Sequence, residues 1–339
     1  MESPINWSKF TAIIHSSSRV LLTAHQRPDG DCLGSELAMR LILLALGKEV
    51  RIVNPHPTPP GLDFLDKAGS IKPLEQLTDE DKIWISHADL LIVLDTSSWA
   101  QLGAMAPVFK ASQARKLVLD HHAKGDDIGA ERFIDPEAEA TGILVIRAAD
   151  ALNVPLNREI AEAAFAAVST DTGWFRFSSV NAETYRTAAR LIDAGVVPAT
   201  FYQKFYEQAS LGRIRLIGRT LAQIEPYFDG KLMLTRIMLN DFEIAGALSS
   251  DSEDIINMAL QVKDSQMAVL ISELKDGSFK ISFRSRSMID CSRLAAQFGG
   301  GGHKQAAGAA SDLTYEQTKQ AVLQAVEEAF NLQTTNPKQ

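Results

Sequence analysis

The chain has 339 residues, 45% of them hydrophobic and 22% charged, so it is long enough for two domains of ordinary globular composition. No apolar run approaches the roughly 18 residues of a membrane span, no signal-peptide layout opens the chain, and the two cysteines form no redox or zinc spacing, so we expect a cytoplasmic protein. The formal net charge of −8 argues against a broad basic face, and therefore favours small phosphorylated ligands or very short oligomers over a long duplex.

Short apolar runs alternate with helical patterns through the first half of the chain. Strands are predicted over 19–24, 49–55, 89–97, 115–122 and 131–135, and helices over 34–47, 137–153 and 156–168. Strands that alternate with helices predict an α/β fold, in which a mainly parallel sheet carries helices on both faces.

The pattern changes in the second half of the chain. Residues 181–224 are typical of a nearly continuous helix, broken near 193–198, and we assign 193–224 as a helical linker after a domain over 1–192. Two alternating runs after residue 225 each contain an Asp-Gly pair, which predicts hairpins, and 314–330 has the pattern of an amphipathic helix. We therefore expect a smaller C-terminal α/β domain with a mixed sheet over 225–332, followed by a tail over 333–339.

Acidic and histidine side chains gather where predicted elements end. Three clusters follow strands and a fourth follows an alanine-rich helix; they are His25, Asp29 and Asp31, then Asp95, then Asp120, His121 and His122, and finally Asp171. Ligands of open α/β sheets bind at the carboxyl ends of the strands, so the fold would bring the first three clusters to one edge.

The stretch around Asp31 has two interpretations that its own residues do not separate. Asp31 precedes a helical pattern, and aspartate is a good helix N-cap. A metal site would also account for His25 and Asp29, which a single cap leaves unexplained.

The combined donor set favours the metal interpretation. Four carboxylates beside two or three imidazoles cannot all stay ionised together without cations. Mixed carboxylate and imidazole ligands suit Mn²⁺, Zn²⁺ or Fe²⁺, and six ligands suit two ions that share a bridge. Two ions about 3.5–4 Å apart can stabilise both the attacking and the leaving oxygen of a phosphoryl displacement.

Six segments in order make the chain resemble the DHH family of phosphoesterases. They are HQRPDGDCLGS, LIVLDTSS, LVLDHH, STDTGWFRF, FRSRS and FGGGGHKQAAG. Within the family the chain is similar to the nanoRNase/pAp phosphatases, which cut short oligoribonucleotides to mononucleotides and remove the 3′-phosphate of adenosine 3′,5′-bisphosphate. The resemblance implies a catalytic, metal-binding DHH domain over 1–192 and a substrate-binding DHH-associated domain over 225–332.

The resemblance also implies roles for the clustered residues. One metal would bind to His25 and Asp29, the other to Asp31, His121 and Asp171, and Asp95 would bridge both. We expect two divalent ions, Mn²⁺ before Mg²⁺ or Co²⁺. His122 would face the phosphate as donor or general acid, and Asp120 would either orient a neighbouring imidazole or simply accept backbone amides.

Two further parts of the chain are candidates for contacts with substrate. In the C-terminal domain they are Arg284, Arg286, Gly300, Gly301, Gly302 and His303. The glycine run is either a flexible linker or, as we expect, a concavity of backbone N–H groups that binds an anion. Arg284 and Arg286 are two apart on a strand and so face one side, although Arg286 could simply be solvated.

The other candidates near the site are weaker. The aromatic residues Trp174, Phe175 and Phe177 are either core residues or a stacking surface for a base, and Arg176 is a candidate contact. Relatives often carry asparagine shortly after the DHH triplet, where this chain has an acidic pair, Asp126 and Asp127.

The expected function is a two-metal oligoribonuclease and pAp phosphatase that acts on short single-stranded oligoribonucleotides and small nucleotides. A membrane and a long duplex are not expected as partners. A phosphodiesterase for cyclic di-AMP or pApA is the alternative within the family, and a non-catalytic nucleotide-binding regulator is the alternative from another class. The sequence leaves open a homodimer, the native metal and the polarity of cleavage.

Overall fold

The computed structural model describes residues 4–286 and 289–335. Contacts within the chain divide it into two compact units, Met1–Glu207 and Gln208–Gln339. The boundary falls inside the segment 193–224 that we predicted as a linker. Each unit has its own hydrophobic core, and each is described by itself below.

The first unit is built on a six-stranded sheet in which every pair of neighbouring strands is parallel. The strand order is β3-β2-β1-β4-β5-β6. The strands are β1 (Arg19–Thr23), β2 (Glu49–Asn54), β3 (Ile71–Pro73), β4 (Leu90–Leu94), β5 (Arg115–Asp120) and β6 (Glu131–Ile134). All five residues of β4 are buried, as expected for a central strand covered on both faces. The predicted parallel sheet is confirmed.

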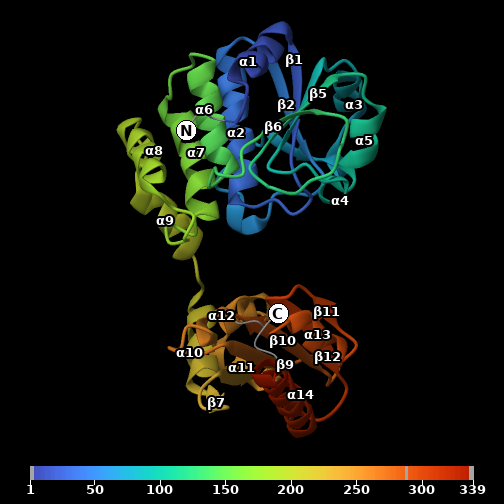
Figure 1. Cartoon of the computed structure of the whole chain (residues 1–339), viewed down its shortest axis with the longest axis vertical. Coiled ribbons are helices and arrows are strands. Elements are labelled where there is room, and N and C mark those ends of the chain that lie inside the picture. The colour runs from blue at the N-terminus through green and yellow to red at the C-terminus, as the bar shows by residue number, and fades with distance from the viewer. Residues whose placement is uncertain (1–3, 287–288, 336–339) are drawn as a thin grey trace. The chain divides into compact units, whose positions relative to one another are not determined.

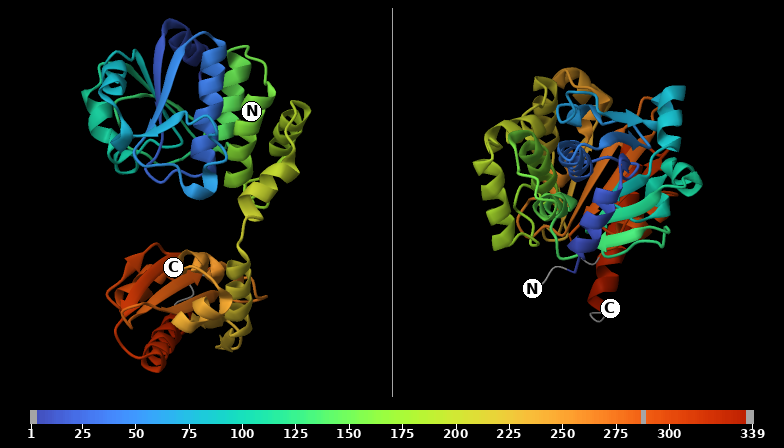
Figure 2. Two further views of the ribbon diagram at one scale, coloured as in Figure 1. Left: turned by 180° about the vertical axis from the view of Figure 1, so that it is seen from behind. Right: turned by 90° about the horizontal axis from the view of Figure 1, so that it is seen from above.

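Helices cover both faces of this sheet (Figures 1 and 2). One face carries α1 (Trp7–Ser16), α2 (Gly30–Ala45), α6 (Thr141–Ala151) and α7 (Arg158–Asp171), and the other carries α3 (Asp79–Ser86), α4 (Trp99–Leu102) and α5 (Met105–Ala111). Helices α2 and α7 pack closely because Gly34 has no side chain: a Cβ there would lie 2.5 Å from the Ala163 carbonyl oxygen. Gly30, the first residue of α2, packs in the same way against Thr170, so the start of α2 lies beside the end of α7.

The helical region after α7 is broken twice. We predicted one break near 193–198, but the chain forms α8 (Ala182–Asp193), α9 (Pro198–Tyr206) and α10 (Leu211–Ala222). Phe201 of α9 packs in the core of the first unit, whereas Leu216 of α10 is fully buried in the second. The helices within the predicted linker therefore belong to different units.

The second unit contains a mixed six-stranded sheet in the order β11-β12-β10-β9-β8-β7. Its strands are β7 (Glu225–Tyr227), β8 (Leu232–Ile237), β9 (Met267–Glu273), β10 (Phe279–Ser285), β11 (Gly301–Gly302) and β12 (Ala306–Ser311). Neighbouring strands are antiparallel except β8 and β9, which are parallel. The predicted hairpins are present, with Gly230 (φ 78°) and Gly277 (φ 85°) in the left-handed conformation that such turns need. The mixed sheet agrees with the prediction.

The remaining elements are short, apart from the last helix. They are α11 (Leu239–Ala245), α12 (Ile255–Ala259), α13 (Cys291–Ala296), α14 (Tyr315–Thr335) and the 3-10 turns η1 (Pro60–Leu62), η2 (Leu74–Gln76) and η3 (Ser249–Ser252). Helix α14 continues to Thr335, into the segment 333–339 that we predicted as a tail. Residues 336–339 of that segment lie outside the described residues.

Candidate metal centre

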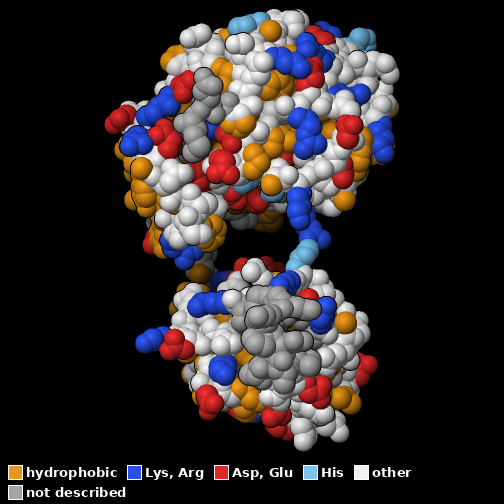
Figure 3. Space-filling model, in the orientation of Figure 1, with side chains coloured by type: hydrophobic (Ala, Val, Ile, Leu, Met, Phe, Trp, Pro, Cys, Tyr) orange, Lys and Arg blue, Asp and Glu red, His pale blue; other side chains and the backbone are white. Residues whose placement is uncertain are grey.

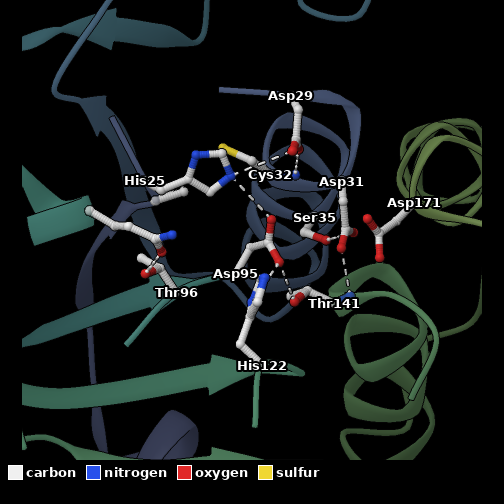
Figure 4. A network of polar contacts seen from close by, with 12 residues as sticks. His25, Asp29, Asp31, Cys32, Ser35, Asp95, Thr96, His122, Thr141 and Asp171 are labelled. Atoms are coloured by element: carbon white, nitrogen blue, oxygen red, sulfur yellow. Dashed lines mark hydrogen bonds and ion pairs between the residues drawn. The ribbon is translucent and has the colours of Figure 1, made fainter. Parts of the chain in front are cut away.

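Five parts of the first unit bring their polar side chains to the carboxyl edge of the sheet (Figure 4). His25 follows β1, Asp95 follows β4, and Asp120 ends β5 directly before His121 and His122. Asp29 and Asp31 lie at the start of α2, and Asp171 is the last residue of α7. The fold therefore collects side chains that are up to 146 residues apart in sequence, counted from His25 to Asp171.

Helix α2 starts earlier than the sequence pattern suggested, and Asp31 is not its cap. Asp29 is the N-cap, because its carboxylate accepts the Cys32 N–H at 3.0 Å. Asp31 lies inside the first turn and accepts the N–H groups of Thr141 (2.8 Å) and Gly142 (2.9 Å) at the start of α6. The N-cap interpretation of Asp31 was therefore wrong for its own helix.

The first group of potential ligands consists of His25, Asp29 and Asp95, whose donor atoms all lie within 4.8 Å of one another. His25 Nε2 lies 3.3 Å from Asp95 Oδ2 and 3.7 Å from Asp29 Oδ2. The Asp29 side chain is 59% exposed and the Asp95 side chain only 3%, so this group opens to solvent on the Asp29 side.

The second group consists of Asp31, His121 and Asp171. His121 Nε2 lies 3.9 Å from Asp31 Oδ2 and 3.5 Å from Asp171 Oδ2. The same nitrogen lies 3.5 Å from Asp95 Oδ1, whereas Asp95 Oδ2 faces His25. The two oxygens of Asp95 are therefore turned toward different groups.

Burial disfavours the charged forms of the acids at this edge. Burial, followed by repulsion from Asp95 and Asp171, raises the pKa of Asp31 well above its ordinary value. Burial and the nearby Asp29 carboxylate raise the pKa of Asp95 in the same way, and burial raises the pKa of Asp171. Nearby positive charge would reverse this penalty, because an opposite charge favours the ionised carboxylate. The electrostatics of the site therefore favour the binding of cations.

Asp120 and His122 form a pair beside the two groups. The Asp120 carboxylate accepts His122 Nδ1–H at 2.8 Å and the His122 backbone N–H at 3.0 Å, so both interpretations that we left open for Asp120 are present in one side chain. The hydrogen bond to Asp120 raises the pKa of His122 to about 9. His121 is held separately, with Nδ1 3.1 Å from the Ala138 carbonyl oxygen.

The sequence analysis missed several residues that support the site. Thr141 donates its hydroxyl to Asp95 Oδ1 at 2.9 Å, and Ser35 donates to Asp31 Oδ1 at 3.1 Å. Buried Glu36 accepts Asn54 Nδ2–H at 2.7 Å, and Asn54 Oδ1 accepts the N–H of Ala24, the residue before His25. Ser35 is one turn after Asp31, which is a local signal, but no sequence pattern connects the other contacts.

The acidic pair after the DHH triplet accepts hydrogen bonds from backbone N–H groups. Asp126 accepts the Trp99 N–H at 2.8 Å, and Asp127 accepts the Gly129 N–H at 3.0 Å. Gly125 packs against Ser97, because a Cβ there would lie 1.9 Å from the Ser97 hydroxyl oxygen. Asp126 thus joins this loop to the start of α4, and Asp127 has a partner within the loop.

The aromatic residues after Asp171 divide between core and surface. Trp174 and Phe175 pack against the core in left-handed backbone conformation, with φ values of 59° and 60°, whereas Phe177 is 53% exposed. Arg176 Nε donates to the Gly173 carbonyl at 2.7 Å. The core interpretation thus fits the first two residues, and Phe177 is the one whose exposure leaves it available for a base.

The candidate substrate residues of the second unit lie on or beside strands β10 and β11, which β12 separates in the sheet. Arg284, which is half-buried on β10, is paired with small residues on both sides, Ala268 of β9 and Ala306 of β12. Arg286 directly follows β10 and is exposed, as is His303 after β11. The small neighbours leave the Arg284 guanidinium room on that face of the sheet.

The glycine run is neither a flexible linker nor a set of free N–H groups. Gly299 and Gly300 donate to the carbonyls of Ala296 and Ala295, at 3.1 and 2.9 Å, and Gly301 and Gly302 form strand β11. Gly300 is required sterically, because a Cβ would lie 2.2 Å from the Gly308 carbonyl oxygen. Our physical argument for an anion-binding concavity was therefore wrong for Gly300, whose N–H is used inside the fold.

On the face drawn in Figure 3, Lys and Arg side chains are interspersed with Asp and Glu over both units, rather than gathered into one basic field. In the described part of the chain, every helix is too short or too polar to cross a membrane.

Comparisons with known proteins agree on one family. Residues 19–168 match the model of the DHH family, N-terminal domain, and residues 243–332 match that of the DHHA1 domain. The chain is 32% identical to the bifunctional oligoribonuclease and PAP phosphatase NrnA of Thermus thermophilus, over 91% of this chain and 89% of that one. It is 25% identical to the cyclic-di-AMP phosphodiesterase GdpP of Geobacillus thermodenitrificans, over 94% of this chain but 48% of that one.

A solved structure shows the same architecture. The crystal structure of an exopolyphosphatase-related protein from Bacteroides fragilis superposes with a TM-score of 0.84 at 28% identity, covering 98% of this chain and 99% of that one. The predicted resemblance is thus confirmed along nearly the whole chain, and the chain belongs to the DHH family, with a DHHA1 domain after its DHH domain.

Proposed function

We propose that this chain is a phosphoesterase that holds two divalent cations and hydrolyses short oligoribonucleotides to mononucleotides and 3′-phosphoadenosine 5′-phosphate to AMP. The observation that carries the proposal is that Asp95 turns one oxygen toward each of two ligand groups: Oδ2 lies 3.3 Å from His25 Nε2 within its own group, and Oδ1 lies 3.5 Å from His121 Nε2 of the other. The NrnA relatives, which align over most of their length, are oligoribonucleases and PAP phosphatases, and this supports the proposed substrate class.

The residues at the edge of the sheet fit such cations. His25 and Asp29 would hold one, Asp31, His121 and Asp171 the other, and Asp95 both. Buried carboxylates that burial alone would keep protonated become good ligands beside a cation. The mixed oxygen and nitrogen donors favour Mn²⁺, with Mg²⁺ or Co²⁺ as alternatives. When bound, the cations would supply a nucleophile at neutral pH and neutralise charge on the phosphate.

His122 would be the proton donor of the reaction. Asp120 accepts the proton on Nδ1 at 2.8 Å, so this carboxylate sets the tautomer and the ring orientation. Nε2 is then the nitrogen that can donate to a phosphate oxygen and protonate the leaving oxygen. The His122 side chain is 47% exposed while Asp120 is fully buried, which suits a donor that must meet a substrate and a partner that must not move.

The second unit would bind the end of the substrate. We assign contact with the substrate to Arg284, Arg286 and His303, and support of this region of the sheet to the segment Gly300–Gly302. The guanidinium group of Arg284 can bind phosphate through two parallel hydrogen bonds. Gly300 donates its N–H within the fold, so we do not assign it as a donor to the substrate. Its role is to allow close packing of the backbone, because a Cβ there would clash with the Gly308 carbonyl oxygen.

A second candidate function is hydrolysis of cyclic di-AMP or pApA. The similarity to the GdpP phosphodiesterase over 94% of this chain favours it, although this chain spans about half of that relative. A cytoplasmic location and a homodimer remain predictions from the sequence.

A product analysis separates these functions. The full chain with Mn²⁺ is given pAp, pApA, cyclic di-AMP and a five-nucleotide RNA in parallel, with Asp95→Asn as the control for a contaminating nuclease. We expect AMP from pAp and mononucleotides from the RNA, and neither from the control. Preferred turnover of cyclic di-AMP or pApA would support the second function, and tight binding of nucleotides without turnover would indicate a regulator.

A further inference from the structure

Thr141, the first residue of α6, contacts both ligand groups of the candidate metal centre. Its hydroxyl donates to Asp95 Oδ1 at 2.9 Å, and its backbone N–H donates to Asp31 Oδ2 at 2.8 Å. The residue is fully buried. One residue thus touches the carboxylate that the groups share and a carboxylate that belongs to only one of them.

The start of α6 depends on these contacts for its own hydrogen bonds. The N-cap position is Ala140, whose methyl side chain cannot accept a hydrogen bond, and the first N–H groups of a helix need acceptors from outside it. Asp31 of α2 provides them, with one oxygen for Thr141 and the other for Gly142 at 2.9 Å. The positive end of the α6 dipole also favours the charged carboxylate there.

Asp95 needs comparable support, because its position is unusual. Its backbone is left-handed, with a φ value of 61°, which is uncommon for a residue other than glycine. A carboxylate that must present one oxygen to His25 and the other to His121 has to be held against rotation of its side chain. The Thr141 hydroxyl hydrogen bonds to Oδ1, the oxygen on the His121 side.

We propose that Thr141 is a positioning residue that fixes Asp95 and Asp31 at the spacing needed to hold two divalent cations side by side. The proposal rests on the two-metal function proposed above. Hydrogen bonds to ligands from outside the first coordination shell commonly change metal affinity by about 10–100-fold, so the contribution is measurable.

The test compares three substitutions in the full chain. Thr141→Val has nearly the same shape but no hydroxyl, Thr141→Ser keeps the hydroxyl, and Thr220→Val removes an equally buried helical hydroxyl of the second unit, which donates to the Leu216 carbonyl at 2.8 Å. Calorimetric titration of the metal-free proteins with Mn²⁺ gives stoichiometry and affinity, and circular dichroism checks that each variant is folded. Thr141→Ala replaces Thr141→Val if the latter does not fold.

We expect Thr141→Val to bind its weaker Mn²⁺ about 10–100-fold less tightly, while Thr141→Ser and Thr220→Val stay within about threefold of the wild type. Unchanged Mn²⁺ binding by Thr141→Val would overturn the proposal, and so would equal losses in the Val and Ser variants, since the hydroxyl would then not matter. A wild type that binds a single Mn²⁺ would contradict the two-metal function, while the Val and Ser comparison would still decide whether Thr141 supports that ion. A wild type that binds none would refute both.

Discussion

Glu36 is a fully buried acid on α2, and its replacement tests the electrostatics of the first unit apart from the metal ligands. Asn54 Nδ2 donates to Oε2 at 2.7 Å, and Cys32 Sγ lies 4.0 Å from the same oxygen. Among the described residues none donates to Oε1. Burial raises the pKa of Glu36 from 4.5 to about 8, so the folded chain holds a neutral acid there at neutral pH.

The sign of the pH effect follows from the proton balance. Between pH 4.5 and about 8 the folded state keeps the proton that the unfolded state has lost, so the free energy of unfolding falls as pH rises. The stabilising contribution is complete below pH 4.5 and is lost once the pH exceeds about 8. A shift from 4.5 to about 8 corresponds to roughly 5 kcal/mol over the whole window, as an upper estimate.

Glu36→Gln removes this titration and keeps the shape. Its amide oxygen can still accept from Asn54, so we expect a folded protein whose unfolding free energy depends less on pH. Urea denaturation of the metal-free wild type and variant at half-unit steps from pH 5 to 9 gives the difference between them, in which the other acids cancel. Glu80→Gln, at an 88% exposed side chain, is the control for loss of one negative charge. Parallel curves for the wild type and Glu36→Gln would refute the buried neutral acid.

Three other predictions concern the second unit, the ligand groups and the substrate. Gly300→Ala should lower the free energy of unfolding by about 1–3 kcal/mol, because the new Cβ would lie 2.2 Å from the Gly308 carbonyl oxygen. Gly301→Ala should have a far smaller effect, since no described atom lies within 4 Å of its Cβ, and thermal unfolding compares the two variants. Asp95→Asn should cut turnover of a short RNA by more than about 100-fold while circular dichroism shows an unchanged fold, and wild-type turnover would exclude a shared ligand. Rates on end-labelled RNAs should peak at a few nucleotides and fall with length, since a chain of net charge −8 gives distant phosphates little attraction; faster digestion of a long RNA would contradict this.

The parallel sheet was predictable because its central strands, β1, β4 and β5, each contain a short run of buried apolar residues. β1, β4 and β5 appear close to where the sequence pattern put them, since a strand buried on both faces has little choice of residue type. The segment between β2 and β4 was not predicted, because β3 has three residues and alternates in burial. A strand of three residues is too short to show a hydrophobic periodicity.

The gathering of the acids and histidines was also predictable, but the way each is held was not. A strand end shows where a side chain starts, and so Asp95, Asp120 and His121 could be placed at one edge in advance. The partners of these residues come from elsewhere: Thr141 is 46 residues from Asp95, and Ala138 is 17 residues from His121. These contacts depend on how α6 packs against the sheet, and a local sequence pattern does not predict that packing.

The structure of the glycine run could not be predicted from the sequence either. Consecutive glycines are compatible with a linker, with a nest of free N–H groups and with close packing, because each of these needs the absence of a side chain. Only the pairing of β11 with β12, which brings Gly300 against Gly308, decides among them. A backbone N–H group can donate to a ligand only if it is not already hydrogen-bonded within the fold.

The distribution of supporting contacts implies that the metal centre forms together with the fold of the first unit. The inner side chains are held from several parts of the fold: Asp31 and Asp95 by the start of α6, His121 by the Ala138 carbonyl, and His122 by Asp120 at the end of β5. Thr141 is 46 residues from Asp95 and 110 residues from Asp31 in sequence, so the spacing of these carboxylates exists only in the folded state. The repulsion among the buried acids opposes folding, and any cation held between them offsets it. Binding of the proposed cations would therefore offset the electrostatic free energy that is needed to bring these acids together at the edge of the sheet.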